Sequence, residues 1–211
     1  MMSEPTVFVV DDDEAMRNSL RWLIESVGLK TETHDSAASF LEAYYPGRTG
    51  CVILDVRMPG LSGLELQDKL SFQDANIPII VLTGHGDVPM AVRAMKSGAV
   101  DFLEKPCNDQ LLLDCIQHAL DQDAEQKADM SLKTDIKSHM AQLTPREHDV
   151  LEMVVEGTPN KEIAAALGVS TRTVEVHRAK VMEKMQANSL ADLVRMSMVI
   201  GLVHEEAEAE G

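Results

Sequence analysis

Four acidic side chains, Asp11, Asp12, Asp13 and Glu14, directly follow an apolar run at residues 7–10. Carboxylates held this close repel one another, so at least one would be protonated unless cations neutralise the cluster. Mg²⁺ suits such a site, because it prefers one or two carboxylates together with water and phosphate oxygens. The cluster therefore predicts a magnesium site, and a carboxylate beside the metal could accept a phosphoryl group as a nucleophile.

The elements that must position this site are short β-branched runs that alternate with amphipathic stretches as far as residue 118. The alternation predicts an α/β fold, a doubly wound five-stranded parallel sheet, which binds ligands at the carboxyl ends of its strands. Asp55, Thr83 and Lys105 end or follow three further strands, so we expect them beside Asp11 and Asp12. The expected strands are 6–11, 31–35, 51–55, 78–83 and 100–104, and the expected helices are 14–27, 36–43, 62–72, 87–97 and 109–120.

The segments VVDDDEA, LDVRMPG, LTGHG and DFLEKP resemble, in order, the motifs of the receiver domain of bacterial response regulators, which is flavodoxin-like. The resemblance covers residues 5–120. It implies that Asp55 is the phosphoacceptor, and that Asp12, Asp55 and the backbone carbonyl of Arg57 hold Mg²⁺, with Asp11 reached through water. It gives no direct role to Asp13.

The same resemblance implies roles for residues around the phosphoryl group. Thr83 would donate a hydrogen bond to it, Lys105 would contact it, and Phe102 would be the aromatic switch residue. Arg57 and His85 lie two residues after Asp55 and Thr83, at places that flank the path of the attacking water, so we expect them to set the rate of dephosphorylation.

Two alternatives concern the chemistry of the first domain. A phosphatase with an aspartate nucleophile resembles DxDGT on its first strand, whereas this chain has DDDEA there and Asp55 on the third strand. The chain has no GxxxxGK[ST] loop, so it is not expected to take phosphate from ATP. We expect a sensor histidine kinase or a small acyl phosphate to be the donor, and we expect a signalling protein rather than an enzyme.

A second domain begins where the sequence pattern changes, at residue 143. Thr144, Pro145 and Glu147 form a helix start with a capping box. A further start at Thr158-Pro159 opens a short helix, the turn 168–170 follows, and a longer helix covers residues 171–185, before a last helix at 189–200. Two helices joined by a short turn that contains glycine predict a helix-turn-helix domain.

Residues 158–196 resemble the four-helix LuxR/NarL-type DNA-binding domain, and RTVEVHRA with VMEKM and SLADLVRM is similar to FixJ-type response regulators. The family implies that Glu175, Val176 and Ala179 lie in the major groove of DNA. Basic side chains nearby would contact phosphates, which positions the protein without specifying sequence. The expected DNA-binding residues are Lys161, Thr171, Arg172, Thr173, Glu175, Val176, Arg178, Ala179 and Lys180, while His177 is expected to be a packing residue.

The two domains are expected at residues 1–120 and 143–200, joined by a helical linker at 121–142 and followed by an acidic tail at 201–211 that we expect to be disordered. Apolar residues recur at every fourth position from Leu120 to Met140, a narrow stripe that could pair two chains or simply belong to a solvated spacer. The spacing does not decide between the two.

Composition limits the partners and the compartment. The net charge is −16, yet residues 140–200 are nearly neutral and hold a short basic window, so DNA remains a possible partner. Cys51, Cys107 and Cys115 lack metal-ligand spacing and fit reduced structural thiols. No leader or membrane-spanning run is found, so we expect a cytoplasmic protein without membrane contact.

These features together predict a DNA-binding transcriptional regulator of a two-component system, controlled by phosphorylation. We expect a homodimer on phosphorylation, formed through residues 88–97 and 100–104, which would place two DNA-binding domains on an inverted-repeat operator. The charged residues expected at this contact are Arg93, Lys96, Asp101 and Glu104. RNA polymerase is a further expected partner, and the remaining alternatives are a protein-interaction module and an RNA-binding antiterminator.

Overall fold

The structure, a computed structural model, describes residues 4–72, 75–84 and 88–202. They divide into two compact units, with the boundary between Lys127 and Ala128. His85 and residues 203–211 of the acidic tail lie outside the described residues. Within the described part of the chain, no helix is long and apolar enough to cross a membrane.

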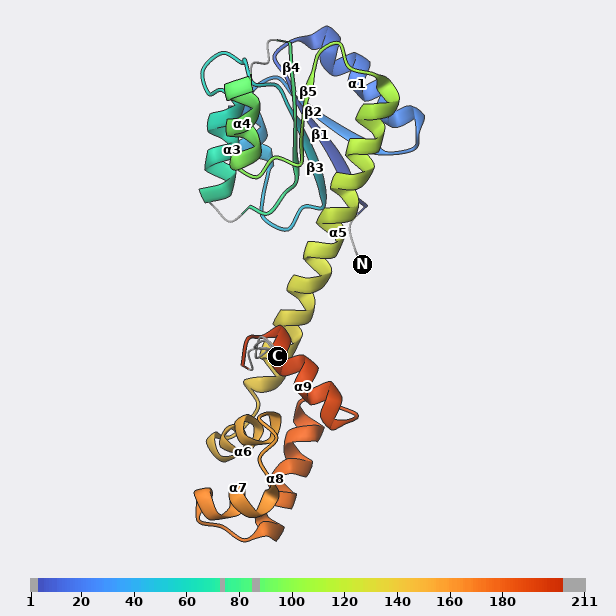
Figure 1. Cartoon of the computed structure of the whole chain (residues 1–211). Coiled ribbons are helices and arrows are strands. Elements are labelled where there is room, and N and C mark those ends of the chain that lie inside the picture. The colour runs from blue at the N-terminus through green and yellow to red at the C-terminus, as the bar shows by residue number, and fades with distance from the viewer. Residues whose placement is uncertain (1–3, 73–74, 85–87, 203–211) are drawn as a thin grey trace, which may run out of the picture. The chain divides into compact units, whose positions relative to one another are not determined.

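The first unit is a parallel sheet with helices on both faces, as Figure 1 shows. Its strand order, β2-β1-β3-β4-β5, confirms the predicted doubly wound fold. The strands are β1 (Thr6–Val10), β2 (Lys30–His34), β3 (Gly50–Leu54), β4 (Ile79–Thr83) and β5 (Asp101–Glu104). The helices are α1 (Glu14–Ser26), α2 (Ala37–Ala43), α3 (Gly63–Phe72), α4 (Val88–Lys96) and α5 (Asp109–Met140).

Two hydrophobic cores lie on the two faces of this sheet, because successive strand side chains point to opposite sides. Phe8, Val10 and Leu54 pack with α2, α3 and α4, whereas Val7, Val9 and Ile53 pack with α1 and α5. The three central strands β1, β3 and β4 are buried along their whole length. This rigid layer fixes the positions of the residues that follow the strand ends.

Helix α5 continues without a break through the predicted helical linker to Met140, so the helix expected at 109–120 and the linker form one element. The apolar stripe predicted there is also partly used inside the chain. Leu120 is buried in the core of the first unit, and Ile136 is buried in that of the second. Ala124, Ala128 and Leu132 are exposed and are all that remains of the stripe as a surface.

The second unit contains α6 (Pro145–Val155), α7 (Asn160–Leu167), α8 (Thr171–Lys184) and α9 (Leu190–Val199). The predicted capping box is present at the start of α6, where Thr144 and Glu147 bond each other's backbone N–H groups. Helix α7 begins directly after the predicted start at Thr158-Pro159, and its capping residue is Pro159, which offers no side-chain acceptor. Gly168, with φ of +67°, ends α7 in the left-handed conformation that glycine adopts readily.

The three cysteines are free thiols, as predicted, with Cys51 and Cys115 buried and Cys107 half-buried. Burial, with a smaller effect from the charge of Asp123, raises the pKa of Cys51 to about 12. Burial and a hydrogen bond to Asp101 raise the pKa of Cys115 to about 11. Both groups therefore remain protonated thiols and act as small apolar packing residues.

Candidate functional site

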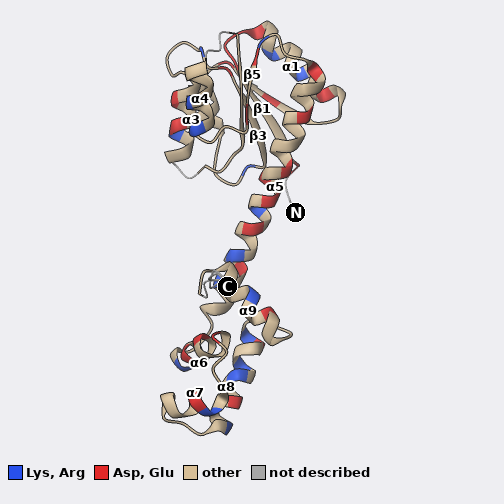
Figure 2. Cartoon of the chain, in the orientation of Figure 1, with Lys and Arg blue, Asp and Glu red and all other residues tan. Residues whose placement is uncertain are grey.

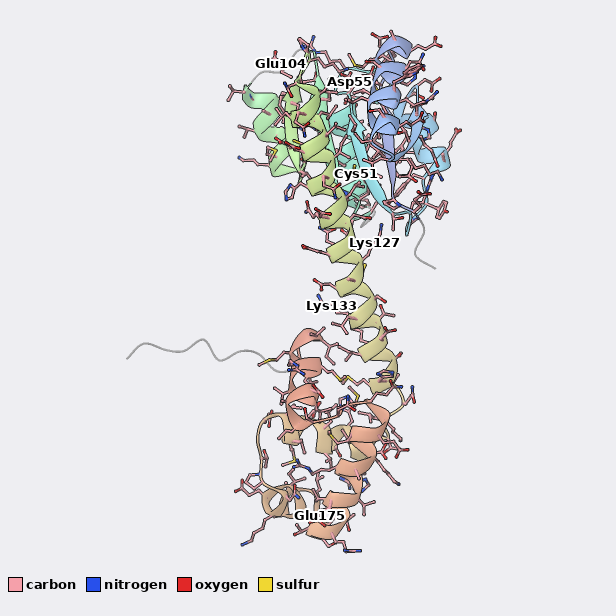
Figure 3. The ribbon with its side chains drawn as sticks, turned by 90° about the vertical axis from the view of Figure 1, so that its right-hand side faces the viewer. Cys51, Asp55, Glu104, Lys127, Lys133 and Glu175 are labelled. Atoms are coloured by element: carbon pink, nitrogen blue, oxygen red, sulfur yellow. The ribbon has the colours of Figure 1, made fainter. Side chains whose placement is uncertain are left out.

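Strand register brings the predicted acidic residues together. Val10 of β1 pairs with Leu54 of β3, so Asp11 and Asp55, the next residue of each strand, lie side by side. The Asp55 N–H donates to the carbonyl of Val10 at 2.9 Å, which holds the two strand ends in this register. Both carboxylates are nearly buried, with 3% and 6% of their surfaces exposed. Figure 3 shows Asp55 at one end of the sheet.

Lys105 is the cation that joins these two acids. Its Nζ donates to Oδ2 of Asp11 at 2.5 Å and to Oδ1 of Asp55 at 3.0 Å. Burial alone would lower the pKa of Lys105, but the hydrogen bonds to Asp11 and Asp55 raise it above its ordinary value. One lysine thus pairs with two buried carboxylates, so the site keeps a net negative charge that favours a further cation.

The backbone fixes the orientation of each carboxylate. Oδ2 of Asp55 accepts the N–H of Arg57 at 2.8 Å, and Oδ1 of Asp11 accepts the N–H of Asp13 at 2.9 Å. Asp13 in turn caps α1, because its Oδ1 accepts the N–H of Ala15 at 2.8 Å. Asp11 and Asp13 therefore have different tasks, since Asp11 pairs with Lys105 whereas Asp13 is a helix cap.

Asp12 is exposed beside the buried pair, and Figure 2 shows acidic residues gathered where the strands end beside α1. The structure describes no group of three or more acidic, histidine or cysteine side chains close enough to hold a metal ion. Two carboxylates, a backbone carbonyl and water form the donor set that Mg²⁺ prefers, since it retains several waters. Asp12, Asp55 and the carbonyl of Arg57, the predicted ligands, are donors of this chemical type.

Thr83 and Phe102 lie on the two strands that follow β3 in the sheet. Thr83 is the last residue of β4 and is fully buried, and its carbonyl accepts the N–H of Lys105 at 2.8 Å. Phe102 pairs with Val81 and packs half-buried against the core on the α4 side. In this register Thr83 pairs with Glu104, two residues after Phe102 on β5.

Gly63 is a residue of this site that sequence reasoning missed. A side chain at this position would place its Cβ 2.1 Å from the carbonyl oxygen of Asp55, so only glycine fits. The Gly63 N–H donates to the carbonyl of Val56 at 3.0 Å, which binds the start of α3 to the loop after Asp55. Its signal was the glycine one residue after the expected helix start, but that position alone does not reveal a backbone contact.

The second unit presents one face of α8 to solvent. Val174 and Val181 are buried, as is Met185 just after the helix, as their spacing predicted. The residues predicted to contact bases, Glu175, Val176 and Ala179, are exposed, as are Thr171, Arg172, Lys180 and Lys161. Figure 2 shows lysines and arginines spread along α8. An exposed helix that mixes basic, acidic and apolar side chains can contact both phosphates and base edges.

Two predicted DNA-contacting residues have intramolecular partners. The guanidinium of Arg178 donates to Oδ1 of Asn160 at 2.8 Å, which holds α8 against the first residue of α7. The hydroxyl of Thr173 forms a hydrogen bond with the hydroxyl of the capping residue Ser170 at 2.8 Å. Arg178 and Thr173 are half-buried, so both help to set the helix-turn-helix geometry. His177 is also half-buried, in keeping with the predicted packing role.

The residues predicted for the dimer contact also differ in their surroundings. Arg93 pairs with Asp68 of the same chain at 2.8 Å, and Asp101 accepts the thiol of Cys115 at 3.1 Å. Lys96 and Glu104 are exposed. Three apolar side chains of α4 are exposed as well, and sequence reasoning did not single them out: Val88, Val92 and Met95.

Both units match known families. Residues 7–117 match the family described as response regulator receiver domain, and residues 141–197 match the luxR family of bacterial regulatory proteins. The chain is 50% identical over 196 residues to the transcriptional regulatory protein FixJ of Azorhizobium caulinodans, and the match covers 93% of each protein.

Solved structures of whole regulators are also similar. The response regulator StyR has a TM-score of 0.85 at 46% identity, and the match covers 93% of this chain and 99% of that one. Full-length FixJ from B. japonicum has a TM-score of 0.56 at 46% identity, with 95% and 98% covered. These two matches extend over both family segments and over the part of α5 that lies between them.

Proposed function

The chain belongs to the FixJ-type response regulators, in which a receiver domain is joined to a LuxR-type DNA-binding domain, and we propose that Asp55 is the phosphoacceptor through which its DNA binding is controlled. The observation that carries this proposal is the pairing of Asp55 and Asp11 with a single lysine, Lys105. Asp55 is buried and fixed through both of its oxygens, as a positioned nucleophile must be.

The proposed reaction transfers a phosphoryl group from a sensor histidine kinase. A carboxylate oxygen of Asp55 attacks the phosphorus of a phosphohistidine, a P–O bond forms, and the P–N bond breaks to leave the imidazole of the kinase. The product is an acyl phosphate on Asp55. Lys105, which already contacts Asp55, would contact the new phosphoryl oxygens. Thr83, the buried last residue of the neighbouring strand β4, would donate a hydrogen bond from its hydroxyl to the phosphoryl group.

Mg²⁺ is the proposed cofactor, and Asp12, Asp55 and the carbonyl of Arg57 would hold it, with Asp11 reached through water. When bound, it supplies positive charge to the oxygens of the phosphoryl group. Asp11 keeps Lys105 charged and oriented by its short hydrogen bond. Because the N–H groups of Arg57 and Asp13 orient the two carboxylates, the site is organised before a ligand arrives.

The proposed output is a population shift on the α4 face of the receiver. A phosphoryl group on Asp55 would draw Thr83 and Lys105, and Phe102 would repack beside α4. The exposed Val88, Val92 and Met95 make α4 suited to pairing with a second copy, with Lys96 and Glu104 at its edge. Arg93 and Asp101 would first have to leave their intramolecular partners. Sedimentation as a monomer in both phosphorylation states would contradict this homodimer.

The proposed target is double-stranded DNA with an inverted repeat, read by the exposed face of α8. A dimer places two such helices on half-sites about one helical turn apart. RNA polymerase is a further proposed partner, and we propose that the protein acts in the cytoplasm. Arg178 is assigned to positioning α8 against α7 rather than to a phosphate, because its guanidinium is bonded to Asn160.

Labelling by acetyl phosphate in the presence of Mg²⁺ tests the phosphoacceptor. We expect one phosphoryl group per wild-type chain and none on Asp55→Asn, since an amide is a poor nucleophile and a weaker Mg²⁺ ligand. Asp114→Asn, which removes an exposed carboxylate from α5, is the matched control and should label normally. Undiminished labelling of Asp55→Asn would contradict the assignment, and multiple turnover of a phosphate ester would favour the phosphatase alternative.

A further inference from the structure

A buried carboxylate lies at the end of the sheet opposite to Asp55. Asp123 of α5 is only 2% exposed, although the polar sequence around it predicted a linker. Its Oδ2 accepts the backbone N–H of Gly50 at 2.9 Å. Lys127, one turn further along α5, donates to both carboxylate oxygens at 2.7 and 2.8 Å and to the carbonyl of Arg48 at 2.7 Å. We call Arg48, Gly50, Asp123 and Lys127 the base cluster.

The position of Gly50 is set by the sheet. A side chain there would place its Cβ 1.7 Å from the carbonyl oxygen of Thr6, so the chain passes β1 too closely for any residue but glycine. Gly50 is also the first residue of β3, whose last residue directly precedes Asp55. Figure 3 shows Asp55 and Lys127 toward opposite ends of the sheet, with Cys51 between them. Asp123 therefore holds the beginning of the strand that leads directly to the proposed phosphoacceptor.

Arg48 is held as firmly as Gly50. Its guanidinium lies 4.4 Å from the centroid of the Phe8 ring and pairs with Glu32 of β2. Lys127 thus contacts the backbone carbonyl of Arg48, a residue whose side chain is anchored on β1 and β2. The base cluster links β2, the loop before β3, β3 itself and the continuation of α5 beyond Leu120.

Asp123 and Lys127 lie beyond the segment that matches the receiver family, which ends at residue 117. The compact first unit, however, extends to Lys127. Apolar packing alone would hold α5 on the sheet but is non-directional, so it would tolerate small rotations of the helix. Hydrogen bonds to a buried carboxylate are directional and have no alternative partner in water. Asp123 and Lys127 therefore fix one rotational setting of α5.

We propose that Asp123 and Lys127 are positioning residues that couple the phosphorylation state of the receiver to DNA binding by the second unit. The same uninterrupted helix supplies Ile136 to the core of that unit, so α5 is covalently part of both units. The base cluster connects this helix to the strand that carries the phosphoacceptor. The inference rests on the proposed function, in which phosphorylation of Asp55 controls DNA binding.

The test uses the full chain with Asp123→Asn and Lys127→Met. The matched controls are Glu125→Gln and Lys133→Met, which remove the same charges from exposed positions of α5. Three quantities are measured: labelling by acetyl phosphate, hydrogen exchange of the amides at 121–127, and the ratio of DNA affinities with and without phosphorylation. The probes are DNA fragments from the genome of the source organism, selected for binding to the wild-type protein.

We expect normal labelling in all four variants. The ratio of DNA affinities with and without phosphorylation should fall at least fivefold toward one in Asp123→Asn and Lys127→Met, and should stay at the wild-type value in the two controls. Lys127→Arg, which keeps the positive charge, should restore much of the ratio and guards against simple misfolding. Faster exchange at 121–127 with an unchanged ratio would overturn the inference and leave the base cluster a purely structural feature. A wild-type ratio of one would instead overturn the proposed function, and the coupling with it.

Discussion

The two units each bury a carboxylate against a lysine, yet the two arrangements serve different ends. In the receiver, Lys105 is shared by Asp11 and Asp55, so negative charge is in excess. In the DNA-binding unit, Lys184 lies 2.6 Å from Glu147 alone and also donates to the carbonyl of Gln142 at 3.1 Å. The first arrangement leaves negative charge in excess beside the proposed phosphoacceptor, whereas the second pairs one acid with one cation.

The backbone partners of the two sites explain this difference. Glu147 is 2% exposed and accepts the N–H of Thr144 at 2.8 Å, so it closes the capping box of α6 while Lys184 brings in the end of α8. The hydrogen bond from Lys184, followed by that from Thr144, lowers the pKa of Glu147 to about 2. A single acid with a single cation and a helix cap is a structural brace. Two acids that share one cation form the site at which we propose phosphoryl transfer.

The largest expected effect separates these two roles by stability. Glu147→Gln should destabilise the second unit by about 1.5–3 kcal/mol, the range for a hydrogen bond to a charged group, because Lys184 is left half-buried without its counter-charge. Asp55→Asn should change the stability of the first unit by less than about 1 kcal/mol, since it relieves repulsion at a site where Asp11 still pairs with Lys105. Hydrogen exchange of the full chain reports each unit separately. Equal losses in both variants would refute the contrast.

Acid should break the brace in a defined range. The pKa of Glu147 is lowered in the folded state, so its stabilising contribution is complete above the unfolded value of about 4.5 and is lost as the pH falls toward 2. Exchange of the α6 and α8 amides should therefore accelerate over this range in the wild type. In Glu147→Gln the pH dependence of these amides should be flatter. A profile identical to that of the wild type would assign the acid sensitivity to other groups.

A third carboxylate, Glu175, has neither arrangement, because it is exposed on α8. If it accepts a hydrogen bond from a cytosine amino group, Glu175→Ala should erase discrimination at one base pair, on the order of 1–3 kcal/mol, and raise non-specific affinity. Glu183→Ala removes an exposed charge from the same helix and should shift all sequences alike. Affinities for single-base operator variants at one salt concentration decide the matter. A uniform shift for Glu175→Ala would leave Glu175 a surface charge.

The smallest expected effect concerns the lifetime of the phosphoryl group. Arg57 is exposed beside Asp55 and has no amide to orient an attacking water, so we expect slow self-dephosphorylation. Arg57→Asn should shorten the half-life a few-fold, which corresponds to less than about 1.4 kcal/mol in the barrier. Lys69→Gln, an exposed charge change on α3, should leave it unchanged. The decay of labelled protein measures this, and an unaltered half-life in Arg57→Asn would exclude the role.

The fold and the strand-end residues could be predicted because they are written in local patterns. Alternating periodicities gave five strands, and parallel topology places their ends together, which was enough to group Asp11, Asp55, Thr83 and Lys105. What could not be predicted depends on contacts between distant segments. Asp123 looked like a solvated linker residue, because only the folded sheet brings the Gly50 amide to it.

The same limit applies to individual side chains in the helix-turn-helix unit. Spacing correctly separated the buried Val174 and Val181 from the exposed Glu175 and Val176. Spacing did not show that Arg178 donates a hydrogen bond to Asn160 on the preceding helix. An arginine at such a position of a DNA-binding helix could equally be predicted to contact a phosphate. Helical periodicity shows which face a residue occupies but not which partner it finds there.

The most direct test of the central claim measures the affinity of the full chain for genomic DNA fragments at one salt concentration, with and without acetyl phosphate and Mg²⁺. Our account predicts that phosphorylation strengthens specific binding at least tenfold in the wild type, which is about 1.4 kcal/mol, and has no effect on Asp55→Asn. Equal affinity of the wild type in both states, or an undiminished response of Asp55→Asn, would contradict it.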